Sequence, residues 1–290
     1  MIASAPGKLI LSGEYAVLDG APALVIAVDR RATARRTHAA AHDASPFLRA
    51  VAARTREVPV VADSSAFYDG AQKLGLGSSA AVTVAATACA LGAGASRAEI
   101  LAIALAAHLE AQGSGSGADV AASVFGGAIE FVRGAPPQIL PRAWPQGLAL
   151  VPFWTGVSAD TAALVARVGE SRTARPAEVG AALEEIAAAS RELCAAIALP
   201  AFARAAAAID ALAAATGIEL VPRCLRRARA ALGDGCVVKT TGAGGGDIGV
   251  VLAPATKDVT SIEARLIEAG CAPLRLSLDK TGVDVRPDVR

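Results

Sequence analysis

The 290-residue chain has no excess of charge of either sign and no pair of cysteines at metal-binding spacing. Its 28 lysines and arginines are balanced by 27 aspartates and glutamates, and the two signs are interspersed, so a nucleic-acid-binding surface or an acidic tail is not expected. The five cysteines are odd in number and far apart, which argues against both a disulfide framework and a zinc site. These absences favour a protein of a reducing compartment that acts on small molecules.

The sequence also lacks a leader pattern and a convincing membrane span. Lys8 and Glu14 interrupt the apolar N-terminus, so we expect no signal peptide and predict a cytoplasmic protein that does not bind membranes. The uncharged stretch between Lys73 and Arg97 is long enough to cross a bilayer. It consists mostly of Ala, Gly, Ser and Thr, which supply little transfer free energy, so it is better interpreted as a buried helix.

The stretch K-L-G-L-G-S-S-A-A, residues 73–81, is the pattern in this chain best suited to hold phosphate. Gly75 and Gly77 let backbone amides approach an anion closely, and Ser78 and Ser79 stand where a helix is expected to begin. First-turn amides are unpaired and lie at the positive end of the helix dipole, so they can bind a nucleotide's phosphates. The alternative is an ordinary Gly-Ser turn before a buried helix, and this loop alone leaves both interpretations open.

Two charged residues lie beside other glycine turns. Lys8 follows Pro6-Gly7 at the start of an apolar L-I-L, and its ammonium points either into a site or out to water from the end of a strand. Asp119 follows G-S-G-S-G at the mouth of a short helix, where it is either a functional carboxylate or a helix cap. A carboxylate and an ammonium are the pair that phosphoryl transfer requires.

The alternation of strand and helix patterns predicts an α+β protein with two domains. A proline-rich break places the boundary after Gly147, giving domains 1–147 and 148–290. In the first domain we expect a hairpin over 1–20, strands over 23–28, 32–39 and up to 133, a helix over 47–56, a helix over 97–112 opened by a Ser96–Glu99 capping box, and a short helix ending at 124. In the second we expect strands over 148–153, 236–239, 247–252 and 273–278, and helices over 158–168, 176–217 with a break near Pro200, 222–232 and 261–269.

Three segments together resemble the GHMP kinase superfamily, named for galactokinase and the homoserine, mevalonate and phosphomevalonate kinases. They are A-P-G-K-L-I-L-S-G-E-Y at 5–15, G-L-G-S-S-A-A at 75–81 and K-T-T-G-A-G-G-G-D at 239–247. Within the superfamily, residues 13–24, 112–123 and 154–156 look most like those of phosphomevalonate kinases. The resemblance implies an N-terminal domain like domain 2 of ribosomal protein S5 and a ferredoxin-like C-terminal domain, with ATP and substrate meeting in a cleft.

The resemblance also implies roles for individual residues. Asp119 would orient or deprotonate the acceptor oxygen, Lys8 would compensate its charge, and Ser79 or Ser78 would help to hold Mg²⁺ beside the ATP phosphates. Where mevalonate kinases carry a metal-binding glutamate, this chain has His108, a poor ligand for Mg²⁺ that we expect to be packed or hydrogen-bonded. Glu110 or a serine would then replace it, or the nucleotide would hold the metal. The predicted site is Lys8 and Asp119 for catalysis; Gly75, Leu76, Gly77, Ser78, Ser79 and Ala80 for ATP; Lys8, Lys73, Ser114, Ser116 and Gly244 for the substrate; and Ser79 for the metal.

This set predicts ATP-dependent phosphorylation of 5-phosphomevalonate to 5-diphosphomevalonate in the mevalonate route to isoprenoids. The alternatives are a mevalonate kinase or another GHMP small-molecule kinase and, in a different class, a catalytically silent GHMP-like metabolite sensor, against which the presence of Lys8 and Asp119 argues. Lys8 in A-P-G-K also disfavours a diphosphomevalonate decarboxylase. A Rossmann dehydrogenase is excluded because G-L-G-S-S-A lacks the third spaced glycine and the acidic residue of that fingerprint.

Overall fold

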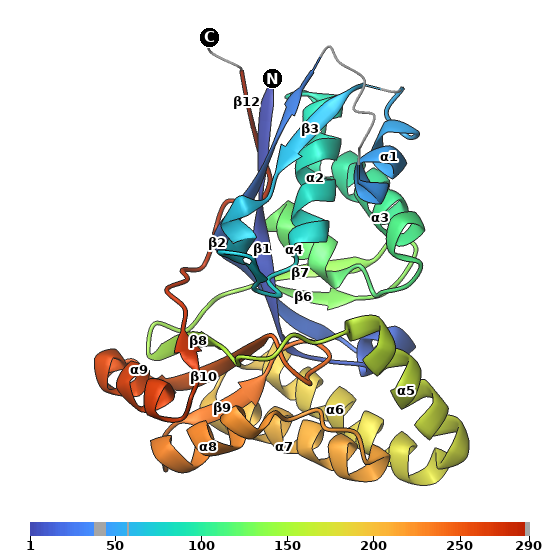
Figure 1. The fold of residues 1–290 in the computed structure, drawn as a ribbon. Coiled ribbons are helices and arrows are strands. Elements are labelled where there is room, and N and C mark those ends of the chain that lie inside the picture. The colour runs from blue at the N-terminus through green and yellow to red at the C-terminus, as the bar shows by residue number, and fades with distance from the viewer. Residues whose placement is uncertain (38–44, 57, 288–290) are drawn as a thin grey trace. The chain divides into compact units, whose positions relative to one another are not determined.

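A computed structural model describes residues 1–37, 45–56 and 58–287 of the chain (Figure 1). It contains two compact units that interleave along the sequence. Unit 1 comprises Met1–Leu9, Val25–Pro141 and Ser277–Arg290, and unit 2 comprises Ile10–Leu24 and Arg142–Leu276. The division into family domains at residues 147 and 148 stays a prediction, because the units are defined by contacts rather than by one cut in the chain.

Unit 1 is built on a six-stranded sheet with the order β12-β1-β2-β6-β7, in which β3 also pairs with β2. β12 runs antiparallel to β1 with Ile2 opposite Arg286, and β3 runs antiparallel to β2 with Thr33 opposite Asp63. The strands are β1 (Ile2–Ser12), β2 (Ala23–Arg36), β3 (Val60–Asp63), β6 (Ala128–Val132), β7 (Gln138–Arg142) and β12 (Asp284–Arg286), and a separate ribbon consists of β4 (Tyr68–Asp69) and β5 (Gln72–Lys73).

The predicted hairpin over residues 1–20 is wrong, because β1 continues through Pro6 and Gly7 without turning. A Cβ added at Gly7 would lie 2.7 Å from the carbonyl oxygen of Leu76 and 2.7 Å from the ring of Phe67. The glycine therefore permits close packing rather than a turn. The segments predicted over 23–28 and 32–39 are likewise one strand, β2, which ends at Arg36; residues 38 and 39 lie outside the described residues.

Four helices lie on one face of this sheet: α1 (Pro46–Ala52), α2 (Ser78–Leu91), α3 (Arg97–Gln112) and α4 (Ala118–Phe125) (Figure 1). α2 is buried along almost its whole length, since its small side chains let neighbouring elements approach from several sides. With 14 residues it is shorter than a membrane span requires. The predicted capping box opens α3: Ser96 Oγ accepts from the amide of Glu99, and the Glu99 carboxylate accepts from the amide of Ser96 at 2.8 Å.

Unit 2 contains an antiparallel four-stranded sheet with the order β11-β8-β10-β9. Its strands are β8 (Leu148–Trp154), β9 (Val237–Thr240), β10 (Ile248–Pro254) and β11 (Ala272–Pro273), so the strand expected over 273–278 is much shorter than predicted. Its helices are α5 (Thr161–Ala174), α6 (Pro176–Ala195), α7 (Leu199–Thr216), α8 (Arg223–Leu232) and α9 (Val259–Glu268). The break near Pro200 is confirmed, because this proline lies in the first turn of α7.

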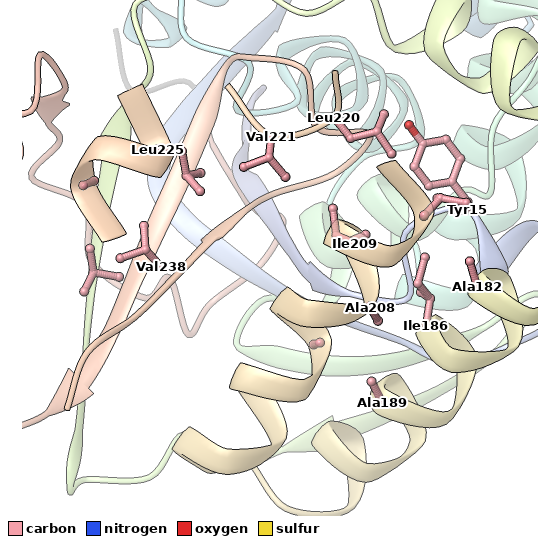
Figure 2. Packing of buried hydrophobic residues seen from close by; sticks show 14 of the residues in the cluster. Tyr15, Ala182, Ile186, Ala189, Ala208, Ile209, Leu220, Val221, Leu225 and Val238 are labelled. Carbon is pink, nitrogen blue, oxygen red and sulfur yellow. The ribbon is translucent and has the colours of Figure 1, made fainter. Parts of the chain in front are cut away.

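The core of unit 2 joins these helices to a short segment from near the N-terminus. Tyr15, which precedes the 3-10 helix Ala16–Asp19, packs in the same buried cluster as Ile186 of α6 and Ile209 of α7 (Figure 2). α7 is by length and composition apolar enough to cross a membrane, a test that the core helices of globular proteins also pass. Phe202, Ile209 and Leu212 of this helix are buried within the protein. The molecule is thus a mixed α+β protein, as predicted.

Candidate active site

The loop at residues 75–77 has a backbone conformation that favours glycine at both ends. Gly75 and Gly77 have φ angles of 72° and 80°, in the left-handed region that only glycine enters without strain. Gly77 is the N-cap of α2, and no side chain caps this helix end. Between the glycines, Leu76 is fully buried and holds the loop in place. The first-turn amides of α2, including those of Ser78 and Ser79, are therefore presented at the loop without a capping side chain.

Lys8 lies directly against this loop. Its backbone amide donates to the carbonyl oxygen of Leu76 at 2.9 Å, which attaches β1 to the loop. Its side chain passes over Gly77, where a Cβ would lie 2.9 Å from Lys8 Cε and 3.2 Å from Lys8 Cγ. Gly77 therefore has two functions, since it adopts a left-handed turn and leaves room for the lysine stem. The structure brings Lys8 and the predicted phosphate loop together.

Asp119 lies in the first turn of α4, two residues after the N-cap, and its carboxylate binds one of the free amides of that turn. The N-cap is Gly117, with φ of 85°, and the Asp119 carboxylate accepts from the amide of Val120 at 2.9 Å. One turn later Ser123 Oγ donates to the carbonyl oxygen of Pro6 in β1 at 2.7 Å. Residues four apart share a helix face, so Asp119 lies on the face of α4 that meets β1, and Lys8 is only two residues beyond Pro6.

His108 in α3 is packed and hydrogen-bonded, as expected. It is 4% exposed, its ring stacks on Phe47 with centroids 5.2 Å apart, and its Nε2 lies 3.2 Å from Ser79 Oγ. Ser79, the predicted metal ligand, thus has its hydroxyl hydrogen-bonded to an imidazole. Glu110, which the sequence offers as a replacement metal ligand, instead pairs with Arg54 at 2.5 Å and is 54% exposed.

These residues fit a magnesium ion carried by the nucleotide better than one held by a cluster of protein side chains. Among the described residues, no group of three or more His, Cys, Asp and Glu side chains could hold a metal. Mg²⁺ in kinase sites commonly keeps several waters and is bound through one or two protein oxygens and the substrate phosphates. Ser79 Oγ is a suitable oxygen donor of this kind once it exchanges its contact with His108.

The predicted substrate residues are more dispersed. Lys73 is exposed in β5, at the start of the loop. Ser114 and Ser116 line a cavity of about 640 Å³ whose apolar wall includes Leu105, but Lys8 and Asp119 are not among its lining residues. Ser116 Oγ also accepts from the amide of Ala118 at 3.2 Å, which stabilises the turn before Asp119. Gly244 belongs to unit 2, so its position relative to these residues is not described.

A buried ion pair supports the third glycine segment, and sequence reasoning gave no role to either partner. The ammonium of Lys239, the last residue but one of β9, pairs with the carboxylate of Glu14, and the side chains are 0% and 1% exposed. Lys239 Nζ also donates to the carbonyl oxygen of Thr240 at 3.0 Å. Burial raises the pKa of Glu14, and the positive charge of Lys239 opposes that shift. The sequence signal for this pair was a single charged residue within each of two largely uncharged segments: a glutamate in S-G-E-Y-A-V and a lysine in C-V-V-K-T-T.

Tyr15 makes a second connection from the same N-terminal segment to this loop. Its hydroxyl donates to the carbonyl oxygen of Ala243 at 2.5 Å, and burial, helped by the neighbouring charge of Glu14, raises its pKa so that the phenol keeps its proton. Tyr15 has a φ of 61°, a strained conformation for a bulky residue. Gly244 packs against Leu220, whose carbonyl oxygen would lie 2.5 Å from a Cβ. The loop at 240–246 is thus fixed from two sides.

Comparisons with known proteins agree on the fold. Residues 55–127 match the family model described as the GHMP kinases N-terminal domain. A crystal structure of the Lin0012 protein from Listeria innocua is 20% identical with a TM-score of 0.84, covering 98% of this chain and 99% of that one. Streptococcus pneumoniae phosphomevalonate kinase in complex with phosphomevalonate and AMPPNP is 17% identical with a TM-score of 0.77, covering 96% and 99%.

A mevalonate kinase from L. major in complex with R-mevalonate is 21% identical with a TM-score of 0.70, covering 96% of both chains. A search of curated protein sequences gives no match. The solved structures share the fold with this chain over nearly its full length, and the family model covers the loop, α2, α3 and α4. Residues 55–127 therefore match the GHMP kinases N-terminal domain, and the chain shares its fold with solved structures of phosphomevalonate and mevalonate kinases over nearly its full length.

Proposed function

We propose that this chain is a phosphomevalonate kinase, which transfers the γ-phosphoryl group of ATP to 5-phosphomevalonate. The observation that carries a kinase function is the arrangement around the loop at 75–77, where Lys8 packs on Gly77. It is supported by Asp119 on the face of α4 that meets β1 and by the match of residues 55–127 to the GHMP kinases N-terminal domain. Phosphoryl transfer depends mainly on positioning and charge neutralisation, which a glycine loop, an ammonium and a carboxylate supply.

Each residue takes a role that follows from its chemistry. The amides of the loop and the first turn of α2 bind the ATP phosphates, with Ser79 as an oxygen donor to the magnesium ion that ATP carries. Asp119 orients or deprotonates the acceptor oxygen, and Lys8 compensates the charge on that oxygen and on the transferred group. Bound magnesium supplies neutralisation of the phosphate charge. The predicted cytoplasmic location is retained as part of this proposal.

The test is an ADP-release assay on the purified protein with mevalonate, phosphomevalonate, galactose and homoserine offered in parallel. We expect Asp119→Asn and Lys8→Met each to lower turnover by about 10²–10⁴-fold while ATP still binds, because both residues act on charge that develops during transfer. Exposed Asp234→Asn and Lys280→Met serve as matched controls and should leave turnover unchanged. Near-normal turnover in a folded Asp119→Asn or Lys8→Met variant contradicts the assigned roles, and no ADP release with any substrate favours the silent sensor.

Preference for phosphomevalonate over mevalonate is the finer part of the proposal. Its support is the resemblance of the sequence segments and the fold shared with a phosphomevalonate kinase, although a mevalonate kinase shares the fold as well. A substrate with a carboxylate and a phosphate needs more donors than Lys8 alone, and Lys73, Arg142, Ser114 and Ser116 are the candidates. Each charge-assisted contact contributes about 1.5–3 kcal/mol, so losing two contacts lowers specificity by roughly a hundredfold or more. Competition at equal concentration measures the preference, and faster use of mevalonate favours the mevalonate kinase alternative.

A further inference from the structure

A cavity of about 640 Å³ lies within unit 1, where α3 faces the neighbouring strands β6 and β7. Its walls are largely apolar, and the large side chains that form them come from α3, β6 and β7: Leu101, Leu105, Leu109, Phe131 and Ile139. Leu109 is 49% exposed, so the cavity is open to water. A concave site of this volume, with apolar walls and a few polar groups, is typical of sites that bind small molecules.

The cavity is elongated along α3, and its two ends differ in polarity. Its lining residues on this helix run from Ala98 to Leu109, a distance of about 16 Å at the helical rise of about 1.5 Å per residue. Phe125 lies at the N-terminal end of α3, where its carbonyl oxygen accepts from the guanidinium of Arg97 at 3.4 Å. The turn at 114–117, which supplies two serine hydroxyls to the lining, follows the C-terminal end of the helix. One end of the cavity is therefore apolar, and the other offers hydrogen-bonding groups.

The charge of the lining favours an anion. Arg133, the residue after β6, is exposed and lines the cavity, and no carboxylate is among the described lining residues. An anionic group would thus meet a guanidinium and serine hydroxyls without repulsion from a neighbouring acid. A substrate with both a carboxylate and a phosphate is a poor match for apolar walls, and Lys8 and Asp119 lie outside the lining. The cavity therefore calls for a different kind of ligand.

We propose that this cavity binds a molecule that combines an apolar chain with a single anionic head group, at a site separate from the residues of phosphoryl transfer. The chain lies along α3 against Leu101 and Leu105, and the head group is bound by the serine hydroxyls of the turn at 114–117, with Arg133 supplying positive charge. Each methylene group of the chain that leaves water strengthens binding by about fourfold. The inference rests on the cavity and does not depend on the proposed kinase function.

Two lining residues connect the cavity to the candidate active site. Leu105 packs against Gly117, the N-cap of the helix that carries Asp119, since a Cβ on this glycine would lie 2.4 Å from Leu105 Cδ2. His108 contacts the first turn of α2, where its Nε2 lies 3.2 Å from Ser79 Oγ. A bound chain would therefore touch the residues that support the starts of α2 and α4.

Isothermal titration calorimetry on the full-length protein tests the proposal with three probes, each below its micelle concentration: decyl phosphate, butyl phosphate and 1-decanol. We expect one decyl phosphate to bind per chain, and butyl phosphate to bind more weakly by roughly a hundredfold or more because its chain is shorter. 1-Decanol has the chain without the charge and should bind about tenfold more weakly than decyl phosphate. Circular dichroism verifies that the chain stays folded, and no activity is measured.

Two variants and their matched controls locate the ligand. Ala102→Phe fills the cavity from an exposed position of α3 and should weaken decyl phosphate binding by about tenfold or more, whereas Ala207→Phe, at an exposed position of α7, should bind as the wild type does. Arg133→Met should weaken decyl phosphate binding by about tenfold and leave 1-decanol binding unchanged. Arg227→Met, at an exposed position of α8, is its control and should change neither.

Several results would overturn the proposal. They are no binding of decyl phosphate to the folded wild type, equal binding by Ala102→Phe and the wild type, and an equal loss of decyl phosphate and 1-decanol binding in Arg133→Met. Displacement of decyl phosphate by phosphomevalonate would make the cavity part of the substrate site rather than a separate one. Binding to vesicles that contain phosphatidic acid, without binding of monomeric decyl phosphate, would point to a membrane surface and contradict the cavity site. Failure of the proposed kinase function would leave all of these measurements unchanged.

Discussion

The buried pair of Lys239 and Glu14 gives the sharpest quantitative prediction. Replacing Lys239 by Met keeps much of the apolar volume but leaves the Glu14 carboxylate without a partner at a position where both side chains are almost completely buried. Removing one partner of a buried ion pair costs about 3–5 kcal/mol, because the remaining charge stays desolvated. We therefore expect Lys239→Met to lower the free energy of unfolding by about 3–5 kcal/mol at neutral pH.

The loss should depend on pH in a defined direction. Burial already raises the pKa of Glu14 in the presence of Lys239, whose charge and hydrogen bond lower it, so Lys239→Met removes the two largest opposing causes and raises the pKa further. The folded state then holds a proton that the unfolded state releases above a pKa of about 4.5, and stability falls as pH rises through that window. The stability deficit of Lys239→Met should thus be smaller at about pH 5 than at about pH 7.

Urea unfolding followed by tryptophan fluorescence is a suitable assay, because both tryptophans, Trp144 and Trp154, belong to unit 2 together with the ion pair. The double variant Glu14→Gln/Lys239→Met removes both charges and should lose less stability than Lys239→Met alone. Arg191→Met is the control, since its pair with Glu184 is 53% and 73% exposed and should contribute less than about 1 kcal/mol.

Two results would refute this reasoning. One is a Lys239→Met protein within about 1 kcal/mol of the wild type with no dependence on pH, which would mean that the pair is effectively solvated. The other is a double variant less stable than Lys239→Met, which would mean that packing or hydrogen bonding, rather than the uncompensated charge, accounts for the loss.

Three further predictions concern unit 1. Gly77→Val should raise the apparent ATP constant sharply, because the left-handed turn and the lysine stem leave no room for a side chain; an unchanged constant in a folded protein would make the loop a simple turn. His108→Ala should lower the free energy of unfolding by about 1–3 kcal/mol, because it loses the stacking on Phe47 and a hydrogen bond. A loss below about 0.5 kcal/mol, measured by urea unfolding, would contradict this prediction. The backbone amide and the hydroxyl of Ser96 donate hydrogen bonds to the Glu99 carboxylate and lower its pKa. The capping box therefore stabilises α3 fully above the unfolded-state pKa of about 4.5, and this stabilisation is lost as the pH falls through the folded-state pKa. Ser96→Ala should therefore destabilise the protein at neutral pH but much less in acid, and thermal unfolding with equal shifts at both pH values would refute the assignment.

The sequence predicted correctly the features that depend on neighbouring residues. Ser96 and Glu99 are three positions apart, so a capping box is readable from the chain and forms as expected. The helix expected to begin at Ser78 and Ser79 does begin there, as α2. Local signals failed at Pro6 and Gly7, where a turn pattern lies inside one long strand because the glycine is needed for packing against Leu76 and Phe67.

By itself the sequence therefore determined the class of fold, the order of the glycine segments and the candidate charged residues, since local conformation and hydrophobic pattern are encoded within a few positions of each residue. Only the tertiary structure decided which distant residues meet: Lys8 with the loop at 75–77, and Glu14 with Lys239. Lys8 and Gly77 are 69 positions apart and Glu14 and Lys239 are 225 apart, and no local pattern encodes such a pairing. They are brought together when the apolar surfaces of separate elements are buried in a common core, and this packing sets the environment in which each charged or nucleophilic group acts.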